Sequence, residues 1–355
     1  METILVYRTG QLGDTICAIP AIRAVRENFK PCRIVLLSDI HPGTVYPKAH
    51  EVLSEFGLID DYLLYDPSRI SSPAAAFDLR RQIARRNIRR MVYLAPRHRS
   101  PAQRIRDFVF FKSCGIKKLH GLRLFRNSDS EEIGQHEVER LLGVLRLEKL
   151  DVPIRPSFSL PVLERVKSNI DELWVKLGLD QKTVIAVGSG SKMPVKRWDL
   201  NSYKMVGEIL ISRYGIHLLS LGGIEDAESA EVLCKAWNPE GVNLTGKTSY
   251  AESAEILRRC AMYLGNDSGA MHLAAAVGIP CVAIFSARDE VGAWHPYGEN
   301  HIVLRKEVEC QGCMLYECIE QNMICMRSIS VDEVVAACEK VLISLGIGKQ
   351  AKALA

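Results

Sequence analysis

The hydrophobic pattern alternates along most of the chain between short apolar runs and longer amphipathic segments. Short apolar runs are typical of buried strands, whereas apolar residues that recur every three or four positions, as at 16, 19, 22 and 25, predict a helix. In the first half we predict strands at 3–7, 33–38, 59–65 and 91–95 and helices at 14–29, 80–90 and 133–148.

The pattern is interrupted at residues 150–161, where Pro153, Pro156 and Pro161 break the periodicity, and we interpret this segment as a linker. Beyond it we predict strands at 183–189, 216–223, 242–245, 261–267 and 280–286 and helices at 201–214, 227–237, 249–260, 268–278 and 330–346. This alternation predicts an α/β protein with two doubly wound parallel sheets, and 355 residues suit two such domains. Ligands of these sheets bind at the carboxyl ends of strands, so we expect a site in a cleft between the domains.

The loop after the first predicted strand reads RTGQLGD, residues 8–14. Gly10 and Gly13 allow positive φ or a close backbone approach. The loop is not G-x-G-x-x-G, which argues against a dinucleotide fingerprint and an NAD-dependent oxidoreductase. Asp14 stands at the start of a helix, where acids are favoured as caps. The residue is therefore either a helix cap or a catalytic base, and the loop alone does not decide between them.

Two further loops follow strands of the second half. VGSGSKMPVKRW offers Ser189, Ser191 and Lys196, whose hydroxyl and ammonium groups can bind a phosphate, although a flexible surface loop would look similar. LGGIEDAES places Glu225 and Asp226 at a strand end, where an acid can accept hydrogen bonds from ribose hydroxyls. A helix cap is the alternative for these acids.

The fourth loop, GNDSGAMHLAAAVGIP, has the most specific pattern. A strand ends at Asp267, and Ser268 and Gly269 open a helix whose N–H groups can face an anion. His272 lies four residues after Ser268 and returns to the same helix face, although a lone histidine there can also be structural. The chain has no D-x-D pair to hold a diphosphate through a metal, so cations and helix N-termini must serve instead.

Positive charge is concentrated in one part of the chain. Residues 80–126 hold 15 Lys or Arg and one acid, Asp107, whereas the 31 basic and 41 acidic residues elsewhere give a net charge of −10. Such a field attracts an anionic substrate or a membrane surface, and a solvated basic helix is the alternative for residues 80–90.

No apolar run reaches the roughly 18 residues of a membrane span, and no basic region precedes a long apolar core at the N-terminus. We therefore expect no transmembrane helix and no signal peptide, and the eleven cysteines are expected to be reduced thiols in the cytoplasm. Cys310, Cys313, Cys318 and Cys325 have the spacing of a small metal site, with structural thiols and disulfides as alternatives.

These motifs together resemble glycosyltransferase family 9, the ADP-heptose:lipopolysaccharide heptosyltransferases. The resemblance covers nearly the whole chain through ILVYRTGQLGDTICAIPAIRAVRE, HEVERLLGVL, GSGSKMPVKRW, LGGIED, GNDSGAMHLAAAVGIPCVAIFSA, WHPYG and the C-x-x-C tail. It implies a GT-B fold of two Rossmann-like domains with an interdomain cleft. Residues 1–155 would bind the acceptor, residues 156–330 the nucleotide-sugar, and residues 331–355 would form a C-terminal helix and tail.

The resemblance also implies an inverting glycosyltransferase that needs no metal or other cofactor for catalysis and moves a heptose, or a related sugar, from an ADP-sugar to a hydroxyl of a lipopolysaccharide-core-like or other anionic glycan. Asp14 matches the general base. The residues expected to bind substrate are Gly13, Ser189, Ser191, Lys196, Glu225, Thr248, Asp267, Ser268, Gly269 and His272. A structural metal at the four cysteines is one role implied for the tail. We expect no nucleic acid partner and a cytoplasmic location, with peripheral contact of residues 80–126 with the inner membrane.

Two other functions fit the same architecture. A sugar-nucleotide epimerase would convert its substrate without an acceptor. A non-catalytic protein would bind the nucleotide-sugar and not turn it over, although the presence of Asp14, Lys196, Glu225 and His272 together argues against that function.

Overall fold

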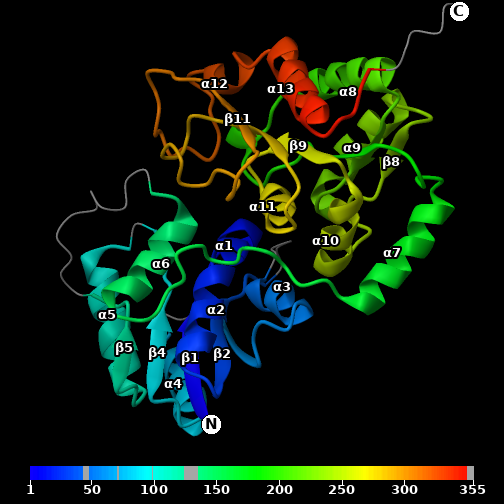
Figure 1. Cartoon of the computed structure of the whole chain (residues 1–355). Coiled ribbons are helices and arrows are strands. Elements are labelled where there is room, and N and C mark those ends of the chain that lie inside the picture. The colour runs from blue at the N-terminus through cyan, green and yellow to red at the C-terminus, as the bar shows by residue number, and fades with distance from the viewer. Residues whose placement is uncertain (43–47, 70–71, 98, 124–134, 350–355) are drawn as a thin grey trace, which may run out of the picture. The chain divides into compact units, whose positions relative to one another are not determined.

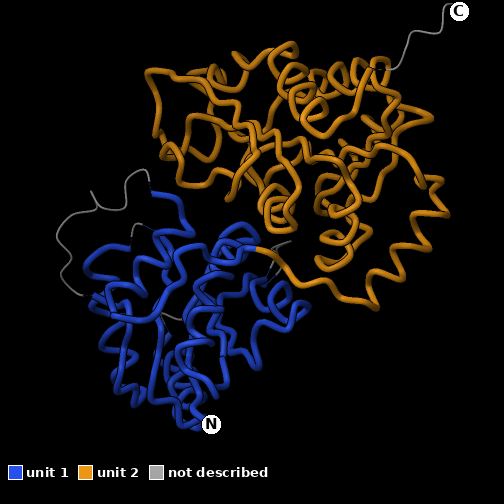
Figure 2. Tube along the Cα trace, in the orientation of Figure 1, with its two compact units in different colours: residues 1–158 blue, residues 159–355 orange. Residues whose placement is uncertain are grey.

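The chain divides into two units, residues 1–158 and 159–355, and the division falls within the proline-rich segment (Figure 2). The computed structural model describes residues 1–42, 48–69, 72–97, 99–123 and 135–349. Parts of three sequence predictions lie outside the described residues: His98 and 124–126 of the basic segment, 133–134 of a predicted helix, and 350–355 of the tail.

Unit 1 is built on a parallel sheet of strand order β3-β2-β1-β4-β5 (Figure 1). Its strands are β1 (Glu2–Tyr7), β2 (Cys32–Asp39), β3 (Asp61–Tyr65), β4 (Arg90–Tyr93) and β5 (Lys118–His120). In the register, Val6 of β1 lies beside Leu36 of β2 and Val92 of β4, and these three side chains are buried. Burial of each such side chain contributes about 1.5–3 kcal/mol, so the centre of the sheet is the core of the unit.

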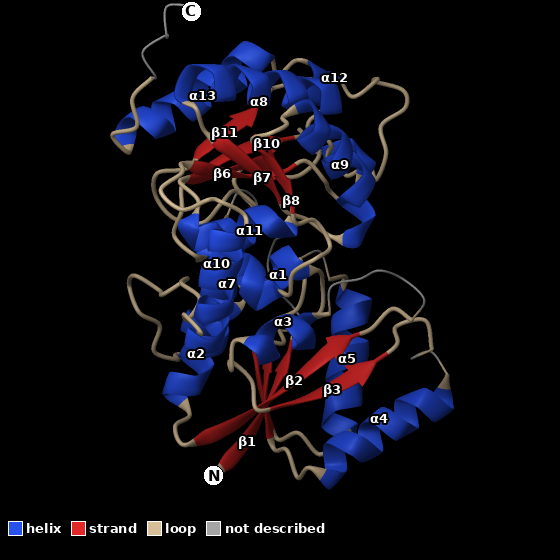
Figure 3. Ribbon diagram, turned by 90° about the vertical axis from the view of Figure 1, so that its right-hand side faces the viewer, coloured by secondary structure: helices blue, strands red, loops and turns tan. Residues whose placement is uncertain are grey.

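The helices of unit 1 form a layer on each side of this sheet (Figure 3). They are α1 (Leu12–Cys17), α2 (Ile19–Asn28), α3 (Ala49–Glu55), α4 (Pro73–Arg85), α5 (Pro101–Ser113) and α6 (Glu137–Leu147). The helix predicted at 14–29 is two helices, because Pro20, which has no N–H group, stands in the first turn of a new helix. The basic helix predicted at 80–90 ends at Arg85, shortly before Asn87 adopts the left-handed φ of 51°. The sequence pattern missed α3, α5 and β5.

Unit 2 repeats the arrangement with a parallel sheet of order β11-β10-β9-β6-β7-β8. Its strands are β6 (Val184–Gly188), β7 (His217–Ser220), β8 (Gly241–Asn243), β9 (Met262–Asn266), β10 (Cys281–Phe285) and β11 (Ile302–Arg305). Its helices are α7 (Glu164–Lys176), α8 (Leu200–Tyr214), α9 (Ala227–Ala236), α10 (Tyr250–Arg259), α11 (Gly269–Ala276), α12 (Ile324–Arg327) and α13 (Val331–Ser344), with short 3-10 turns at Pro194–Lys196 and Ile224–Asp226. Helix α13 packs on α8 and is part of unit 2. The pattern missed α7, β11 and α12.

The strand order locates the place in each sheet where a ligand can enter. The chain leaves β1 toward β2 and later crosses to β4 on the other side, so the loops after β1 and β4 diverge. The loops after β6 and β9 diverge in the same way in unit 2. In doubly wound sheets ligands bind at such switch points. RTGQLGD, VGSGSKMPVKRW and the start of α11 all lie there. None of the helices in the described ranges is long and apolar enough to cross a bilayer.

Candidate functional site

Asp14 lies in the first turn of α1, directly after the strand-end loop of β1. Its Oδ2 accepts a hydrogen bond from the backbone N–H of Gln11 at 3.0 Å, which is a capping interaction. Its side chain is nevertheless 26% exposed, so the carboxylate can also reach a ligand. The capping and catalytic interpretations are therefore compatible.

The loop before Asp14 packs closely against the side chain of this residue at Gly10. Gly10 has a φ of 125°, and a Cβ atom there would lie 2.6 Å from Cβ and Cγ of Asp14. A side chain at position 10 would be strained and would displace the acid. Gly13 lies within α1 and is not one of the residues with positive φ, so the positive-φ expectation holds for Gly10 only.

Arg8 is completely buried at the end of β1 and contacts Asp14 through one edge of its guanidinium group. Nε and Nη2 donate to the carbonyl oxygen of Asp14 at 3.1 and 2.7 Å, and Nη2 also donates to Oδ1 at 3.3 Å. Nη1 donates to Glu137 at the start of α6. No role for Arg8 or Glu137 was predicted from the sequence, although a charged residue at the end of an apolar strand and the acid of HEVER are visible signals.

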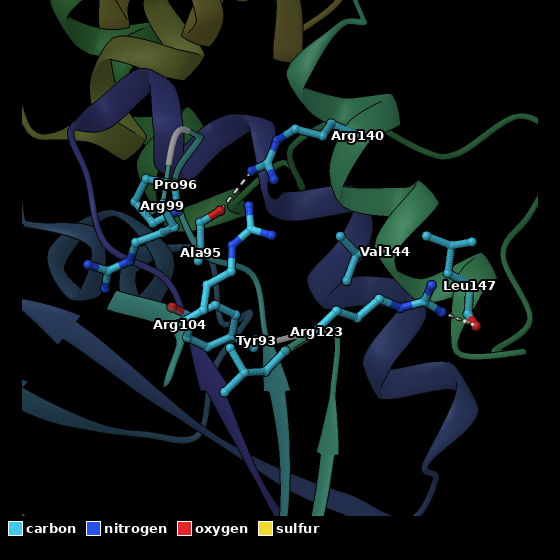
Figure 4. Close-up of a pocket in the computed structure, with 11 residues that line it drawn as sticks. Tyr93, Ala95, Pro96, Arg99, Arg104, Arg123, Arg140, Val144 and Leu147 are labelled. Atoms are coloured by element: carbon cyan, nitrogen blue, oxygen red, sulfur yellow. Dashed lines mark hydrogen bonds between the residues drawn. The ribbon is translucent and has the colours of Figure 1, made fainter. Parts of the chain in front are cut away.

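A pocket at the carboxyl end of β4 lies beside this group (Figure 4). Its lining includes Tyr93, Ala95, Gly121 and the arginines Arg99, Arg104, Arg123 and Arg140. Arg140 donates to the carbonyl oxygen of Ala95 at 2.7 Å, and Arg123 to that of Leu147 at 3.1 Å. These bonds hold two guanidinium groups at one hollow. Arg140 is already paired with Glu137, so an anion can be bound there through the other lining arginines.

The charges of the pocket arginines are balanced to different degrees. Arg99 pairs with Asp107 at 3.2 Å and also donates to the Tyr7 hydroxyl. Arg104 makes no ion pair or side-chain hydrogen bond with any residue in the described ranges. Of the 15 basic residues of the segment 80–126, the pocket lining therefore includes Arg99, Arg104 and Arg123.

In unit 2 Lys196, whose side chain is 11% exposed, lies between two carboxylates. Its Nζ is 2.6 Å from Oδ2 of Asp267 and 2.8 Å from Oδ2 of Asp289. Burial alone would lower the pKa of Lys196, but the two acids outweigh it and raise the pKa, so the ammonium stays charged. Burial raises the pKa of Asp267 although Lys196 opposes this shift. Asp289 was not predicted as a site residue, because the sequence does not show that the segment after β10 lies beside Lys196.

The loop after β6 is tied to the end of β9 by buried hydrogen bonds. The side-chain amide of Asn266 donates to the carbonyl oxygen of Ser189 at 2.6 Å and accepts from the backbone N–H of Trp198 at 3.1 Å. The Ser191 hydroxyl donates to the carbonyl of Asp267 at 3.4 Å. The structure thus brings Ser189, Ser191, Lys196 and Asp267 together.

The loop after β7 also approaches this group, through Asp226. A Cβ atom on Gly190 would lie 2.1 Å from Cγ of Asp226, so the two loops touch at this glycine. Burial and the neighbouring Glu225 raise the pKa of Asp226. Glu225 itself is exposed beside Gly223. The hydroxyl of Thr248, before α10, forms a hydrogen bond with the Ser253 hydroxyl at 2.7 Å. Within the described ranges its side chain forms no hydrogen bond with these loops.

Helix α11 begins at Gly269 with Ser268 as its extended N-cap residue, and the Ser268 hydroxyl lies 3.4 Å from the Tyr263 hydroxyl. His272 is 2% exposed, and its ring packs edge-on against Trp294. The helix N-terminus is therefore placed at the switch point, while the histidine ring belongs to the packed interior beside it.

The cysteine tail does not gather into a metal centre in the part of the chain that the structure describes, which includes every cysteine. All eleven cysteines carry free thiols, and no group of three or more His, Cys, Asp or Glu side chains in the described ranges could hold a metal ion. Cys310, Cys313 and Cys318 are half-buried, and burial raises the pKa of Cys325.

Residues 115–324 match the family model of glycosyltransferase family 9 (heptosyltransferase), which is more than half of the chain. The chain belongs to glycosyltransferase family 9. It is thus a glycosyltransferase, as the sequence motifs predicted. Among curated proteins, this family 9 chain is 22% identical to lipooligosaccharide heptosyltransferase 2 of Campylobacter jejuni over 96% of its own length and 98% of the relative. It is 27% identical to lipopolysaccharide heptosyltransferase 3 of Escherichia coli over 59% of its length and 60% of the relative.

Solved structures confirm the GT-B fold of this family 9 member. The ADP-heptose lipopolysaccharide heptosyltransferase II of E. coli aligns with a TM-score of 0.72 and 20% identity over 98% of this chain and all of that one. A family 9 glycosyltransferase of Veillonella parvula gives 0.72 and 22% over 97% and 98%. The E. coli heptosyltransferase WaaC, solved with ADP, gives 0.66 and 14% over 96% and 99%.

Proposed function

We propose that the chain transfers a heptose, or a related sugar, from an ADP-sugar to a hydroxyl group of a lipopolysaccharide core or another anionic glycan. The names of the curated relatives support the sugar and the acceptor, and the WaaC structures with ADP and with ADP-2-deoxy-2-fluoro heptose support the donor. The observation that carries the proposal is Asp14, a partly exposed carboxylate held at the switch point of the unit 1 sheet. Unit 1 would bind the acceptor, and unit 2 the nucleotide-sugar.

The proposed reaction is a single displacement. Asp14 takes the proton of the acceptor hydroxyl while its oxygen forms a bond to C1 of the donor sugar. The bond between C1 and the diphosphate oxygen breaks, and ADP leaves with the electron pair. Because attack and departure occur on opposite faces of C1, the anomeric configuration inverts.

The charge of the leaving ADP would be balanced in unit 2 without a divalent metal or another cofactor. Ser189, Ser191 and the N-terminus of α11 at Ser268 and Gly269 would contact the diphosphate. Lys196 would add its positive charge beside the diphosphate, and its ion pair with Asp267 would also fix that residue at the start of α11. The remaining expected substrate contacts stay in the proposal: Gly13, Glu225, Thr248 and His272, with Asp226 added as a second candidate for the ribose.

The arginine pocket would bind a phosphate or carboxylate group of the acceptor. Its location beside the switch point and the lack of an ion-pair partner for Arg104 within the described ranges support this role. Arg104→Gln should raise the acceptor KM about 10- to 150-fold with little change in kcat, as expected for the loss of one charged hydrogen bond of about 1.5–3 kcal/mol. Arg81→Gln, on the exposed face of α4 and outside the pocket lining, is the matched control.

The exposed arginines of α4, including Arg81 and Arg85, would support peripheral contact with the anionic inner face of the membrane from the cytoplasm. Sedimentation of the protein with phosphatidylglycerol vesicles at low salt, and its release at high salt, is the expected result. Equal binding to phosphatidylcholine vesicles would refute this contact.

The decisive test of the catalytic role is Asp14→Asn. The amide keeps an acceptor oxygen for the Gln11 N–H, so the variant should fold, but turnover should fall about 10²–10⁴-fold, the usual contribution of a general base. ADP release from ADP-heptose, with de-O-acylated lipopolysaccharide core as acceptor, measures this loss. Near-normal turnover in the folded variant would return Asp14 to a purely capping role. Release of ADP-free heptose or of a new nucleotide-sugar without acceptor would instead indicate an epimerase.

A further inference from the structure

Glu137, the first residue of α6, is a completely buried carboxylate surrounded by guanidinium groups. It accepts hydrogen bonds from Arg140 at 2.7 and 2.8 Å, from Arg97 at 3.0 Å and from Arg8 at 3.0 Å. A buried carboxylate with charged donors on both oxygens is strongly held, because each unpaired partner would carry a large desolvation cost.

Arg8 joins this carboxylate to Asp14. One edge of its guanidinium group faces the main chain and Oδ1 of Asp14, and the other donates to Glu137 Oε1 at 3.0 Å and to the carbonyl of Leu94 at 3.3 Å. The planar group can satisfy both edges only in one orientation. The position of Glu137 therefore fixes the orientation of Arg8, and Arg8 in turn fixes the first turn of α1.

The charge of Arg8 is balanced mainly by Glu137 and less by Asp14. Arg8 has no exposed surface, so its charge must be balanced by the groups that touch it. With Glu137 ionised, Arg8 has a negative partner, which it shares with Arg97 and Arg140. Its contact with the Asp14 carboxylate is longer, at 3.3 Å. The neighbouring arginines outweigh the effect of burial and lower the pKa of Glu137 to about 2, so this partner is present at every physiological pH.

We propose that Glu137 is a positioning residue for sugar transfer, which holds Arg8 so that Arg8 orients Asp14 without becoming its main ion-pair partner. The inference rests on the proposed function, in which Asp14 is the general base. Without the negative charge of Glu137, Arg8 turns to the carboxylate of Asp14, and Asp14 becomes a weaker base in a different orientation.

The test is Glu137→Gln, assayed by ADP release from ADP-heptose with de-O-acylated lipopolysaccharide core. The amide keeps the size of the side chain and removes its charge. We expect kcat to fall about 10- to 100-fold, part of the roughly 10²–10⁴ that a general base contributes, with little change in the donor KM. We also expect the acid limb of the kcat–pH profile to move to lower pH, because the Asp14 pKa falls when a nearby negative charge is removed. Glu137→Asp should recover part of kcat.

Glu139→Gln is the matched control, since Glu139 lies on the same helix, is partly exposed and pairs with Arg146 at 3.2 Å. It should leave kcat and the pH profile unchanged. A folded Glu137→Gln variant with wild-type kcat and pH profile would overturn the proposal. So would a loss of kcat without any movement of the acid limb, which would indicate a structural role only.

A second variant covers the case in which Glu137→Gln does not fold. Arg8→Lys keeps a charge beside Glu137 but cannot donate to both Asp14 and Glu137 through a planar fork. It should lower kcat with an unchanged donor KM, and an unchanged kcat would overturn the proposal. If the proposed function itself is wrong, the Asp14→Asn variant retains turnover. This result distinguishes it from a failure of the proposal for Glu137, in which Asp14→Asn still loses turnover.

Discussion

Replacement of Lys196 by methionine tests how unit 2 holds its strand-end loops together. The substitution removes the ammonium group from between Asp267 and Asp289, whose side chains are 6% and 10% exposed. Asp267 is left without its cationic partner, whereas Asp289 keeps its ion pair with Arg288. Methionine keeps most of the volume of the lysine stem, so the main change is electrostatic.

The magnitude follows from this burial. Removal of one partner of a buried ion pair costs about 3–5 kcal/mol, because an uncompensated charge is left inside the protein. For a unit of this size, a loss of 1 kcal/mol lowers Tm by roughly 2–4 °C, so we expect the Tm of unit 2 to fall by about 6–20 °C. Differential scanning calorimetry measures this, and titration calorimetry with ADP shows whether affinity falls in the folded variant.

Two further variants make the result specific. Lys192→Met removes a lysine of the same loop that is only half-buried and should lower Tm by no more than about 2–4 °C, since exposed ion pairs contribute about 1 kcal/mol or less. Adding Asp267→Asn to Lys196→Met removes the carboxylate that is left without a cation and should recover part of the loss. A Tm for Lys196→Met within about 2 °C of the wild type would refute the reasoning.

Three other substitutions test the site. Gly10→Ala should cost about 1–3 kcal/mol of stability and reduce kcat, because it combines a strained φ with a contact on Asp14. Gly57→Ala is the control for φ strain alone, because Gly57 has a φ of 63° and a Cβ atom there would have no atom within 4 Å. Equal kcat in the two variants would contradict the argument from the contact with Asp14. The pKa of Glu137 is lowered from 4.5 to about 2, so its contribution of about 3 kcal/mol is present above pH 4.5 and lost as the pH falls toward 2; urea unfolding should therefore show the stability gap between wild type and Glu137→Gln narrowing from pH 7 to pH 3. Gly190→Ala places a Cβ atom 2.1 Å from Asp226 Cγ and should weaken ADP binding in titration calorimetry. Unchanged affinity for ADP would show that the loops after β6 and β7 are not part of the donor site.

The parts of the fold that depend on local patterning could be predicted from the sequence. Buried strands such as β1 and β6 are continuous apolar runs, and the loops that follow them carry glycine and polar residues. Helix boundaries were less predictable, because Pro20 and Asn87 end or restart helices within a continuous amphipathic pattern. The family and the GT-B fold followed from the order of the strand-end motifs.

The pairing of buried charges could not be predicted in the same way. Arg8 and Glu137 are 129 positions apart, and the order of five strands has to be known before they can be placed side by side. Lys196 was expected to face a diphosphate, and the structure shows that it also joins Asp267 to Asp289. Glu225 and Asp226 are adjacent acids, and only the geometry of the short 3-10 turn shows that Asp226 is the one that touches Gly190.

The separation of Arg8 and Glu137 also sets an order in time for synthesis of the chain. At roughly 5–20 residues per second, Glu137 is added about 6–26 s after Arg8. Throughout that interval Arg8 lacks the carboxylate that balances it in the finished unit, and Leu94, which also accepts from Arg8, arrives 86 positions after it. A nascent chain that stops before α6 therefore cannot bury the end of β1 at low cost. The loop that carries Asp14 takes its final form only when most of unit 1 has been made.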